Sequence, residues 1–277
     1  MDQSEKCELF RRLHVPGDPF FLANVHDVGS AKMFAAMGAK AIATSSAAFA
    51  FTIGKPDMGH VSRDEMLDHC EDIVRAVDLP VQGDLENGYA HDPDGVAECI
   101  ELADEVGLAG ACIEDSTFED GKPSYDFEVA VARIAAAVEA AEAMPHDFTL
   151  TARADGVMIG AYDVEEAIRR AQAFEEVGAH CIYVPLPPTM EDVATICASV
   201  SAPVNVLCAG KFTKYGRGDF AKAGAARISI GSALARATHR IILEAGHAMI
   251  DDGDFTALAK SVNGAEIDRL LKEGGAD

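Results

Sequence analysis

The stretches LPVQGD (79–84), AGACIED (109–115) and FTLTARAD (148–155) decide the fold, because each is a short apolar run that ends in charged residues. Near-continuous apolar character is typical of a parallel strand that is covered on both faces. Five further runs of this kind are FFLAN (20–24), AKAIATS (39–45), HCIYVP (180–185), PVNVL (203–207) and ARISIG (226–231). The chain therefore has eight candidate strands for one parallel sheet.

Longer amphipathic patterns between these runs predict helices. Many begin with Ser or Asp, which accept the free N–H groups of a first turn, and several end in Gly, which adopts the left-handed terminating conformation. The predicted helices include 30–38, 62–77, 92–107, 126–143 and 163–178. Eight strand–helix units predict a (β/α)₈ TIM barrel, an α/β fold.

The length of 277 residues suits one barrel or two smaller domains, and the regular repeat favours the single barrel. No linker rich in Pro, Gly or Ser divides the chain, so we expect one domain over residues 1–277. Residues 251–277 are expected to form a C-terminal helical extension that caps the barrel or reaches a partner subunit. Glycines at four expected helix-to-strand returns are interpreted as structural: Gly38, Gly107, Gly178 and Gly224.

The net charge of −23 argues against a nucleic acid or an anionic membrane as partner, because both would be repelled at long range. A small anionic substrate would then need locally placed cations, such as Arg153. The same charge is also compatible with adaptation to salt or with plain solubility.

Seven cysteines form no CxxC pair, and an odd count without a secretion signal predicts reduced thiols. The N-terminal segment has no apolar core of a signal peptide, and no stretch is long enough to span a bilayer. We expect a cytoplasmic protein without membrane contact.

Asp84, Glu114 and Arg153 stand at the ends of three runs, so neighbouring parallel strands would bring two carboxylates and a guanidinium together where α/β proteins bind ligands. Glu86 follows Asp84 in DLENGYA (84–90). Clustered acidic oxygens suit Mg²⁺ or Mn²⁺, which prefer hard oxygen ligands. The alternatives are a helix cap or a solvated loop residue for Asp84 or Glu86, and a purely structural Glu114–Arg153 ion pair.

Arg153 can hold a substrate carboxylate in two-point contact. Ser45 and Ser46 follow the second run, where hydroxyl and backbone N–H groups could hold a carbonyl or enolate oxygen, although such a turn also begins ordinary helices. His26, Asp27 and Asn205 are further candidates for the mouth of the barrel. The motifs GxSxG, GxGxxG and GxxxxGK[ST] are absent, which disfavours a serine nucleophile, dinucleotides and ATP.

In this order, NVHDVGSAK, ATSSAAF, VSRDEMLDH, DLENGYA, CIEDS and TARADG resemble the isocitrate lyase and phosphoenolpyruvate mutase superfamily over about residues 15 to 250. The resemblance implies a (β/α)₈ barrel whose last helix is exchanged between subunits, in dimers that associate as tetramers. It implies Mg²⁺ held directly or through water by Asp84, Glu86 and Glu114, with Asp57 as an outer candidate.

By the same resemblance, substrates are small 2-oxo acids or their adducts, which react through a pyruvate enolate. Ser45, with the N–H groups of Ser46 and Ala47, would hold the pyruvyl oxygens. Arg153 would bind the departing or migrating acidic group, and Asn205 is a further substrate-binding candidate.

Two departures narrow the expected activity. Isocitrate and methylisocitrate lyases carry Lys-Lys-Cys-Gly-His after the fourth strand, whereas STFEDGKPSYD (116–126) has neither Cys nor His, and the usual second Asp of the metal motif is Glu86. We expect a carbon–carbon lyase or an oxaloacetate-type decarboxylase. The alternatives are a phosphonopyruvate hydrolase or mutase, for which Thr117 is present but Asn is missing, and a 2-oxo-acid binding protein without catalysis.

Overall fold

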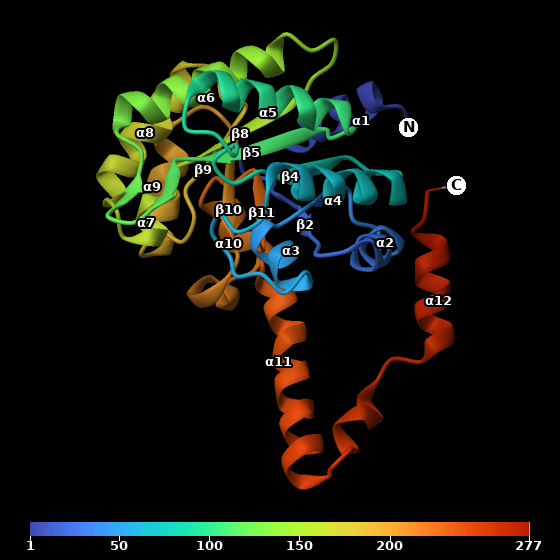
Figure 1. Cartoon of the computed structure of the whole chain (residues 1–277). Helices are drawn as coiled ribbons and strands as arrows, with labels where there is room; N and C mark the ends of the chain where they lie inside the picture. The colour runs from blue at the N-terminus through green and yellow to red at the C-terminus, as the bar shows by residue number, and fades with distance from the viewer. Residues whose placement is uncertain (277) are drawn as a thin grey trace.

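The computed structural model describes residues 1–276, and its centre is a parallel sheet closed into a barrel (Figure 1). The strand order is β1-β11-β10-β9-β8-β5-β4-β3-β2. Strands β1 (Phe20–Phe21) and β2 (Ala23–Asn24) are two halves of the run FFLAN. Because β1 pairs with β11 and β2 pairs with β3, this one run closes the barrel, which confirms the predicted (β/α)₈ class.

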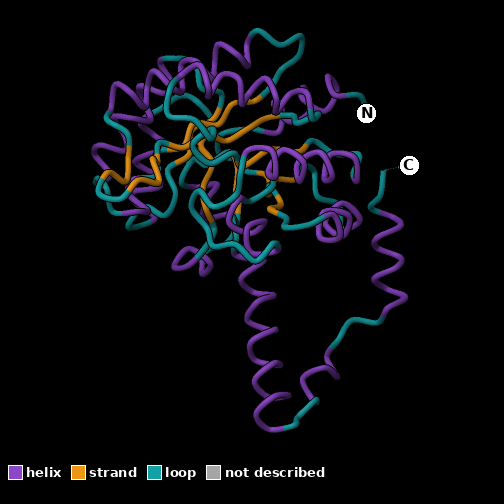
Figure 2. The backbone as a smooth tube through the Cα atoms, viewed as in Figure 1, coloured by secondary structure: helices purple, strands orange, loops and turns teal. Residues whose placement is uncertain are grey.

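The remaining barrel strands lie inside the predicted runs. They are β3 (Ile42–Ala43), β4 (Val81–Asp84), β5 (Gly110–Glu114), β8 (Thr149–Arg153), β9 (Cys181–Tyr183), β10 (Val204–Leu207) and β11 (Arg227–Ser229). Helices surround the strands (Figure 2). They include α2 (Val28–Ala36), α3 (Ser46–Thr52), α4 (Arg63–Ala76), α5 (Pro93–Glu105), α6 (Phe127–Glu142), α7 (Gly156–Ile159), α8 (Val164–Glu176), α9 (Met190–Ser199) and α10 (Arg217–Lys222).

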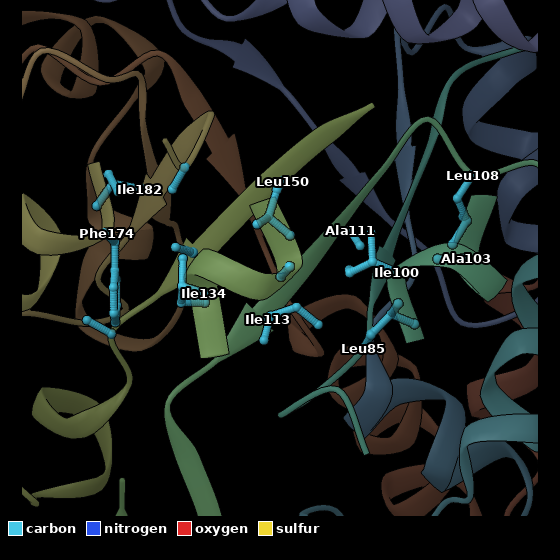
Figure 3. Close-up of a cluster of buried hydrophobic side chains, with 14 of the residues drawn as sticks. Leu85, Ile100, Ala103, Leu108, Ala111, Ile113, Ile134, Leu150, Phe174 and Ile182 are labelled. Carbon is cyan, nitrogen blue, oxygen red and sulfur yellow. The ribbon is translucent and has the colours of Figure 1, made fainter. Parts of the chain in front are cut away.

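The main hydrophobic core lies between the barrel strands and the outer helices (Figure 3). Ile113 and Leu150 point outward from β5 and β8, and both are fully buried. They pack in one cluster with Ile134 of α6 and Phe174 of α8. Burial of such side chains contributes about 25 cal/mol per Å² of apolar surface, so this layer holds the strand ends in fixed positions.

Helix α1 (Gln3–Leu13) covers the opposite end of the barrel from Asp84 and Glu114, and the sequence reasoning did not predict it. Asp2 caps it by accepting the Glu5 N–H at 2.9 Å. Its residues Cys7 and Phe10 are fully buried in a second, smaller core. The barrel is therefore closed by apolar packing at one end and open at the other.

The segment expected as the loop after the fourth strand contains a hairpin of β6 (Ser116–Glu119) and β7 (Lys122–Ser124). Phe118, in strand β6 of this hairpin, has a positive φ of 59°. Its side chain lies so close to Gly59 that a Cβ added to Gly59 would be 3.3 Å from the ring. This contact joins the hairpin to the loop after α3.

Helix α11 (Ala233–His247) runs away from the barrel, and the chain then turns through Ala248–Asp252 and Thr256–Lys260 (Figure 1). Helix α12 (Gly264–Glu273) returns and packs against α2. The Ala276 N–H donates to the Ala76 carbonyl at 2.9 Å. The extension thus contacts its own barrel, and the exchange of helices between subunits stays a prediction.

Local details agree with the expected roles of glycine and cysteine. The four return glycines all have positive φ, between 87° and 99°: Gly38, Gly107, Gly178 and Gly224. All seven cysteines are unpaired. Within residues 1–276, none of the helices combines the length and apolar character needed to cross a membrane.

Candidate functional site

The carboxyl ends of the barrel strands open into a cavity of about 500 Å³, a size typical of sites for small molecules. Strand register places Glu114 directly beside Arg153 on neighbouring strands β5 and β8. Asp84 ends the adjacent strand β4, and all three residues line the cavity. The structure therefore brings together the three charged strand ends on which the sequence interpretation depended.

Arg153 is the central cation of this cavity. Its Nη1 lies 2.8 Å from Glu114 Oε2 and 3.9 Å from Asp84 Oδ1. Its Nε and Nη2 each lie 2.6 Å from Asp155 Oδ1. The guanidinium also lies over the Tyr183 ring, 5.4 Å from its centre. One buried guanidinium is thus shared by three carboxylates.

Burial sets the protonation tendencies of these groups. Loss of water raises the pKa of Glu114 well above its usual value, and the neighbouring Arg153 opposes that shift. For Arg153, burial lowers the pKa, but the surrounding carboxylates outweigh it and the net direction is upward. Arg153 therefore stays positively charged, whereas Glu114 binds a proton more readily than an exposed carboxylate does.

Asp84 is held by the loop after β3. Its Oδ2 accepts the Ser46 N–H and the Ser46 hydroxyl, both at 3.0 Å. Ser45 caps α3 by accepting the Ala48 N–H at 3.4 Å. Within residues 1–276, the Ala47 N–H donates no hydrogen bond, and Ala47 lines the cavity. Of the two N–H groups expected to hold a substrate oxygen, Ser46 is engaged with Asp84 and Ala47 is free.

Glu86 is a buried carboxylate with an incomplete set of partners. Its Oε1 accepts the Gly59 N–H at 3.3 Å, whereas its Oε2 is buried and lacks a hydrogen-bond partner in the described part of the chain. Burial raises the pKa of Glu86 to about 7. Asp57, on the exposed loop after α3, lines the same cavity. An orphaned buried oxygen beside further acidic oxygens suits a cation.

A divalent ion is compatible with these donors, although they do not form a closed cage. Among residues 1–276, no three His, Cys, Asp or Glu side chains are already arranged to hold a metal ion directly. Asp84, Glu86 and Glu114 nevertheless offer only hard oxygen donors. Mg²⁺ often keeps several waters and takes few protein ligands, so the residues fit this ion.

A second layer fixes Asp155 behind Arg153. The Asp155 N–H donates to Asp115 Oδ1 at 2.8 Å. Asp115 Oδ2 in turn accepts from Arg170 Nη1 and from the Tyr162 hydroxyl, both at 2.7 Å. These contacts therefore hold Asp155 in a fixed position next to Arg153.

Three candidates from the sequence lie elsewhere. Asn205 is buried, accepts from Arg227 Nε and donates to Ser229 Oγ, each at 2.9 Å, and lines a separate apolar cavity of about 10 Å³. Asp27 caps α2 by accepting the Ser30 N–H at 2.6 Å. Asn205, Asp27 and His26 do not line the large cavity.

The sequence reasoning missed Arg236 and Arg240, which line the cavity from α11. Their spacing of four residues after the last strand places them on one helix face, and this was the available signal. Arg240 pairs with Glu244 at 2.8 Å, whereas Arg236 has no ion pair within residues 1–276. Apolar side chains complete the wall, among them Met58, Phe118 and Leu186.

Known proteins resemble this chain over nearly its whole length. An uncharacterised protein of Mycobacterium tuberculosis (strain ATCC 25618 / H37Rv) is 31% identical over 267 residues, or 95% of each chain. Oxaloacetate decarboxylase of Pseudomonas putida (strain GB-1) is 28% identical and covers 73% of this chain and 70% of its own.

Solved structures also resemble this chain over nearly its whole length. A candidate lyase/mutase from Burkholderia cenocepacia J2315 superposes with a TM-score of 0.93 at 41% identity, covering 97% of this chain and 96% of its own. Phosphonopyruvate hydrolase, solved with oxalate and Mg²⁺, shares the fold with a TM-score of 0.84 at 22% identity, with 99% and 96% covered. Residues 10–250 match the phosphoenolpyruvate phosphomutase family, so the chain belongs to that family.

Proposed function

We propose that this protein is a Mg²⁺-dependent lyase or decarboxylase that acts on a small 2-oxo acid or 2-hydroxy diacid through an enolate-like intermediate. One observation carries the proposal: Asp84, Glu86 and Glu114 meet Arg153 in one cavity at the carboxyl end of the barrel. The similarity of the chain to an oxaloacetate decarboxylase supports this class of reaction. Mn²⁺ would serve the same oxygen ligands.

Asp84, Glu86 and Glu114 would hold the ion, and Asp57 would act from outside. A bound divalent cation supplies positive charge next to the oxygen on which negative charge develops. Ser46 keeps Asp84 in one orientation through its two hydrogen bonds. This preset geometry matters because electrostatic stabilisation needs donors that do not reorganise during the reaction.

The chain's own donors define how a 2-oxo acid would lie. Ala47 and Ser45 line the cavity, and the free Ala47 N–H would donate to a pyruvyl oxygen. Arg153 would bind the departing acidic group. Arg236 and Arg240 supply further positive charge to the cavity from α11, which suits a substrate with a second carboxylate.

The second candidate is a phosphonopyruvate hydrolase or a mutase that breaks a P–C bond, which the name of the matching family favours. Thr117, the hairpin residue expected to contact a phosphoryl group, donates its hydroxyl to the Lys122 carbonyl. That engagement supports carbon–carbon chemistry. The alternative of another class, a 2-oxo-acid binding protein, would bind the same ligands without turnover.

We also propose a cytoplasmic homo-oligomer, a dimer or tetramer, with no nucleic-acid or membrane partner. The unpaired thiols support a reducing compartment. The exposed apolar side chains of the C-terminal extension support self-association, because monomers rarely expose such a surface.

A substrate panel tests this function. Purified protein is incubated with oxaloacetate, 2-alkylmalates and phosphonopyruvate, with Mg²⁺ or with EDTA, and product is followed by NMR. We expect turnover of a carbon acid that EDTA abolishes and Mg²⁺ restores. D84N should lower kcat/KM by at least about 10- to 100-fold, because even the loss of a group that only orients a metal ligand weakens metal sites by such factors.

The matched control is D78N, which changes an exposed carboxylate paired with the N-terminus, 2.8 Å away. It should leave turnover unchanged. Equal turnover with Mg²⁺ and EDTA would refute the metal-dependent mechanism. Cleavage of phosphonopyruvate alone would favour the second candidate, and calorimetric binding without turnover would favour the binding protein.

A further inference from the structure

Arg153 lies against two of the carboxylates to which the proposed metal site is assigned. Its Nη1 lies 2.8 Å from Glu114 Oε2, and Asp84 Oδ1 lies 3.9 Å from the same nitrogen. Glu114 and Asp84 are two of the three carboxylates assigned to the ion. The guanidinium and a divalent cation would compete for these carboxylates, because like charges that share a partner repel strongly in a buried site.

The remaining donors of Arg153 are held in place. Nε and Nη2 both contact Asp155 Oδ1 at 2.6 Å. Asp155 is itself held in place by two hydrogen bonds. Its backbone N–H donates to Asp115, and its Oδ2 accepts the Ser116 hydroxyl at 3.2 Å. Nε and Nη2 therefore keep their contact with Asp155. Only the carboxylates that face Nη1 are available to bind another cation.

The charges of the cavity make this exchange favourable. Glu86 has a buried oxygen with no partner in residues 1–276, and Asp57 adds a further carboxylate to the rim. One guanidinium cannot neutralise this many carboxylates, and an uncompensated buried charge is costly. A divalent ion would supply the missing positive charge, and Arg153 Nη1 would become available to another anion.

We propose that Arg153 and the divalent cation compete for Glu114 and Asp84, so that the cation binds first and frees Arg153 Nη1 for the acidic group of the substrate. Arg153 is thus both a placeholder in the metal site and a conditional substrate ligand. This inference rests on the proposed function for the assignment of the metal ligands. It adds the order of binding and the residue that enforces it.

Calorimetric titration of Mg²⁺, without substrate, tests the competition. R153Q removes the charge and shortens the side chain but keeps a polar end, so it should bind Mg²⁺ at least about tenfold more tightly than the unchanged protein. R236Q is the matched control: it removes a positive charge from the same cavity, but Arg236 has no ion pair in residues 1–276. Its Mg²⁺ affinity should change less than about twofold.

Oxalate tests the order of binding. We expect the unchanged protein to bind oxalate after Mg²⁺ is added and to show no binding in EDTA. R153Q loaded with Mg²⁺ should bind oxalate at least about tenfold more weakly, because the two-point contact is lost. If R153Q does not fold, as judged by circular dichroism, R153K replaces it; a single ammonium cannot span Glu114 and Asp155, so its Mg²⁺ affinity should rise by a smaller factor.

The outcomes separate this inference from the function on which it rests. A folded R153Q or R153K whose Mg²⁺ affinity equals that of the unchanged protein overturns the competition. Equal oxalate affinity in EDTA and in Mg²⁺ overturns the order. If the unchanged protein binds neither Mg²⁺ nor Mn²⁺, the proposed function itself fails and the inference falls with it.

Discussion

At the scale of residues, the site is a set of buried charges held by fixed partners. Asp84 is held by Ser46, and Arg153 is held by Asp155. Each contact restricts one charged group that would otherwise choose among several neighbours. The chemistry of the cavity therefore depends on which carboxylate each cation faces, and not on the number of charges alone.

A buried histidine away from the cavity gives a prediction for acid stability. His69 is 9% exposed and stacks on Phe49 with 4.0 Å between ring centres, and burial lowers its pKa to about 4. The unfolded chain has the ordinary pKa of about 6.5, so between these values only the unfolded state binds the proton. Stability contributed by His69 is thus complete above about pH 6.5 and is lost as the pH falls toward 4.

Urea unfolding of H69L at pH 7 and at pH 4.5 measures this effect. The loss of unfolding free energy between the two pH values should be smaller in H69L than in the unchanged protein, by up to about 2–3 kcal/mol. H60L alters an exposed imidazole and serves as the control. An identical loss in H69L and the unchanged protein would show that His69 does not carry the effect.

The sequence predicted the strand-end charges because parallel strands share one direction, and the register of β5 with β8 then places Glu114 beside Arg153. It could not predict that the Ser46 N–H donates a hydrogen bond to Asp84, because that contact depends on where α3 starts. Arg236 was missed for a similar reason. Its approach to the cavity is set by the direction in which α11 leaves the barrel.

At the scale of elements, apolar periodicity identified the strands and the long helices, and it failed where short elements depend on tertiary contacts. The run FFLAN is divided between β1 and β2, which pair with different neighbours. The hairpin β6–β7 reads as a polar loop, and its Phe118 is positioned by Gly59. Contacts of this kind connect distant segments, so no local pattern reveals them.

Helix α12 offers a sharp test of such a contact. Gly274 follows this helix and is buried, and a Cβ added there would lie 1.8 Å from the Lys32 carbonyl oxygen of α2. G274A should therefore push α12 away from α2 and destabilise their contact by about 1–3 kcal/mol. Hydrogen exchange should accelerate at 264–276, with little change in the barrel strands.

The control is G264A, at the start of the same helix, where an added Cβ would meet no heavy atom within 4 Å. It should leave exchange at 264–276 unchanged or slower, because Ala favours helix more than Gly. Unchanged exchange in G274A would contradict the described packing of α12 on α2.

At the scale of the whole molecule, the closed barrel carries an arm, formed by α11, α12 and the segment between them, that leaves the barrel and returns to it (Figure 1). The arm exposes large apolar side chains: Ile241, Ile242, Leu243, Ile250, Phe255, Leu258 and Val262. Ile242 is 64% exposed and Ile250 is 84% exposed. We expect a second copy of the chain to cover this surface.

Light scattering after size exclusion tests this expectation. The unchanged protein should have the mass of a dimer or tetramer, and I242E/I250E should shift toward the mass of one chain, because buried unpaired carboxylates oppose association. V129E alters a residue of the barrel helix α6 that is 40% exposed, and it should keep the mass of the unchanged protein. A single-chain mass for the unchanged protein would exclude a stable oligomer.

We propose that Asp84, Glu86 and Glu114 together form one site for a divalent cation. Anomalous diffraction from crystals grown with Mn²⁺ tests it most directly, because the ion reports its own position. We predict one strong peak in the cavity within ligand distance, directly or through water, of these three carboxylates. A cavity without a peak at saturating Mn²⁺, or a peak only at other acidic side chains, would show that these three carboxylates do not form a metal site.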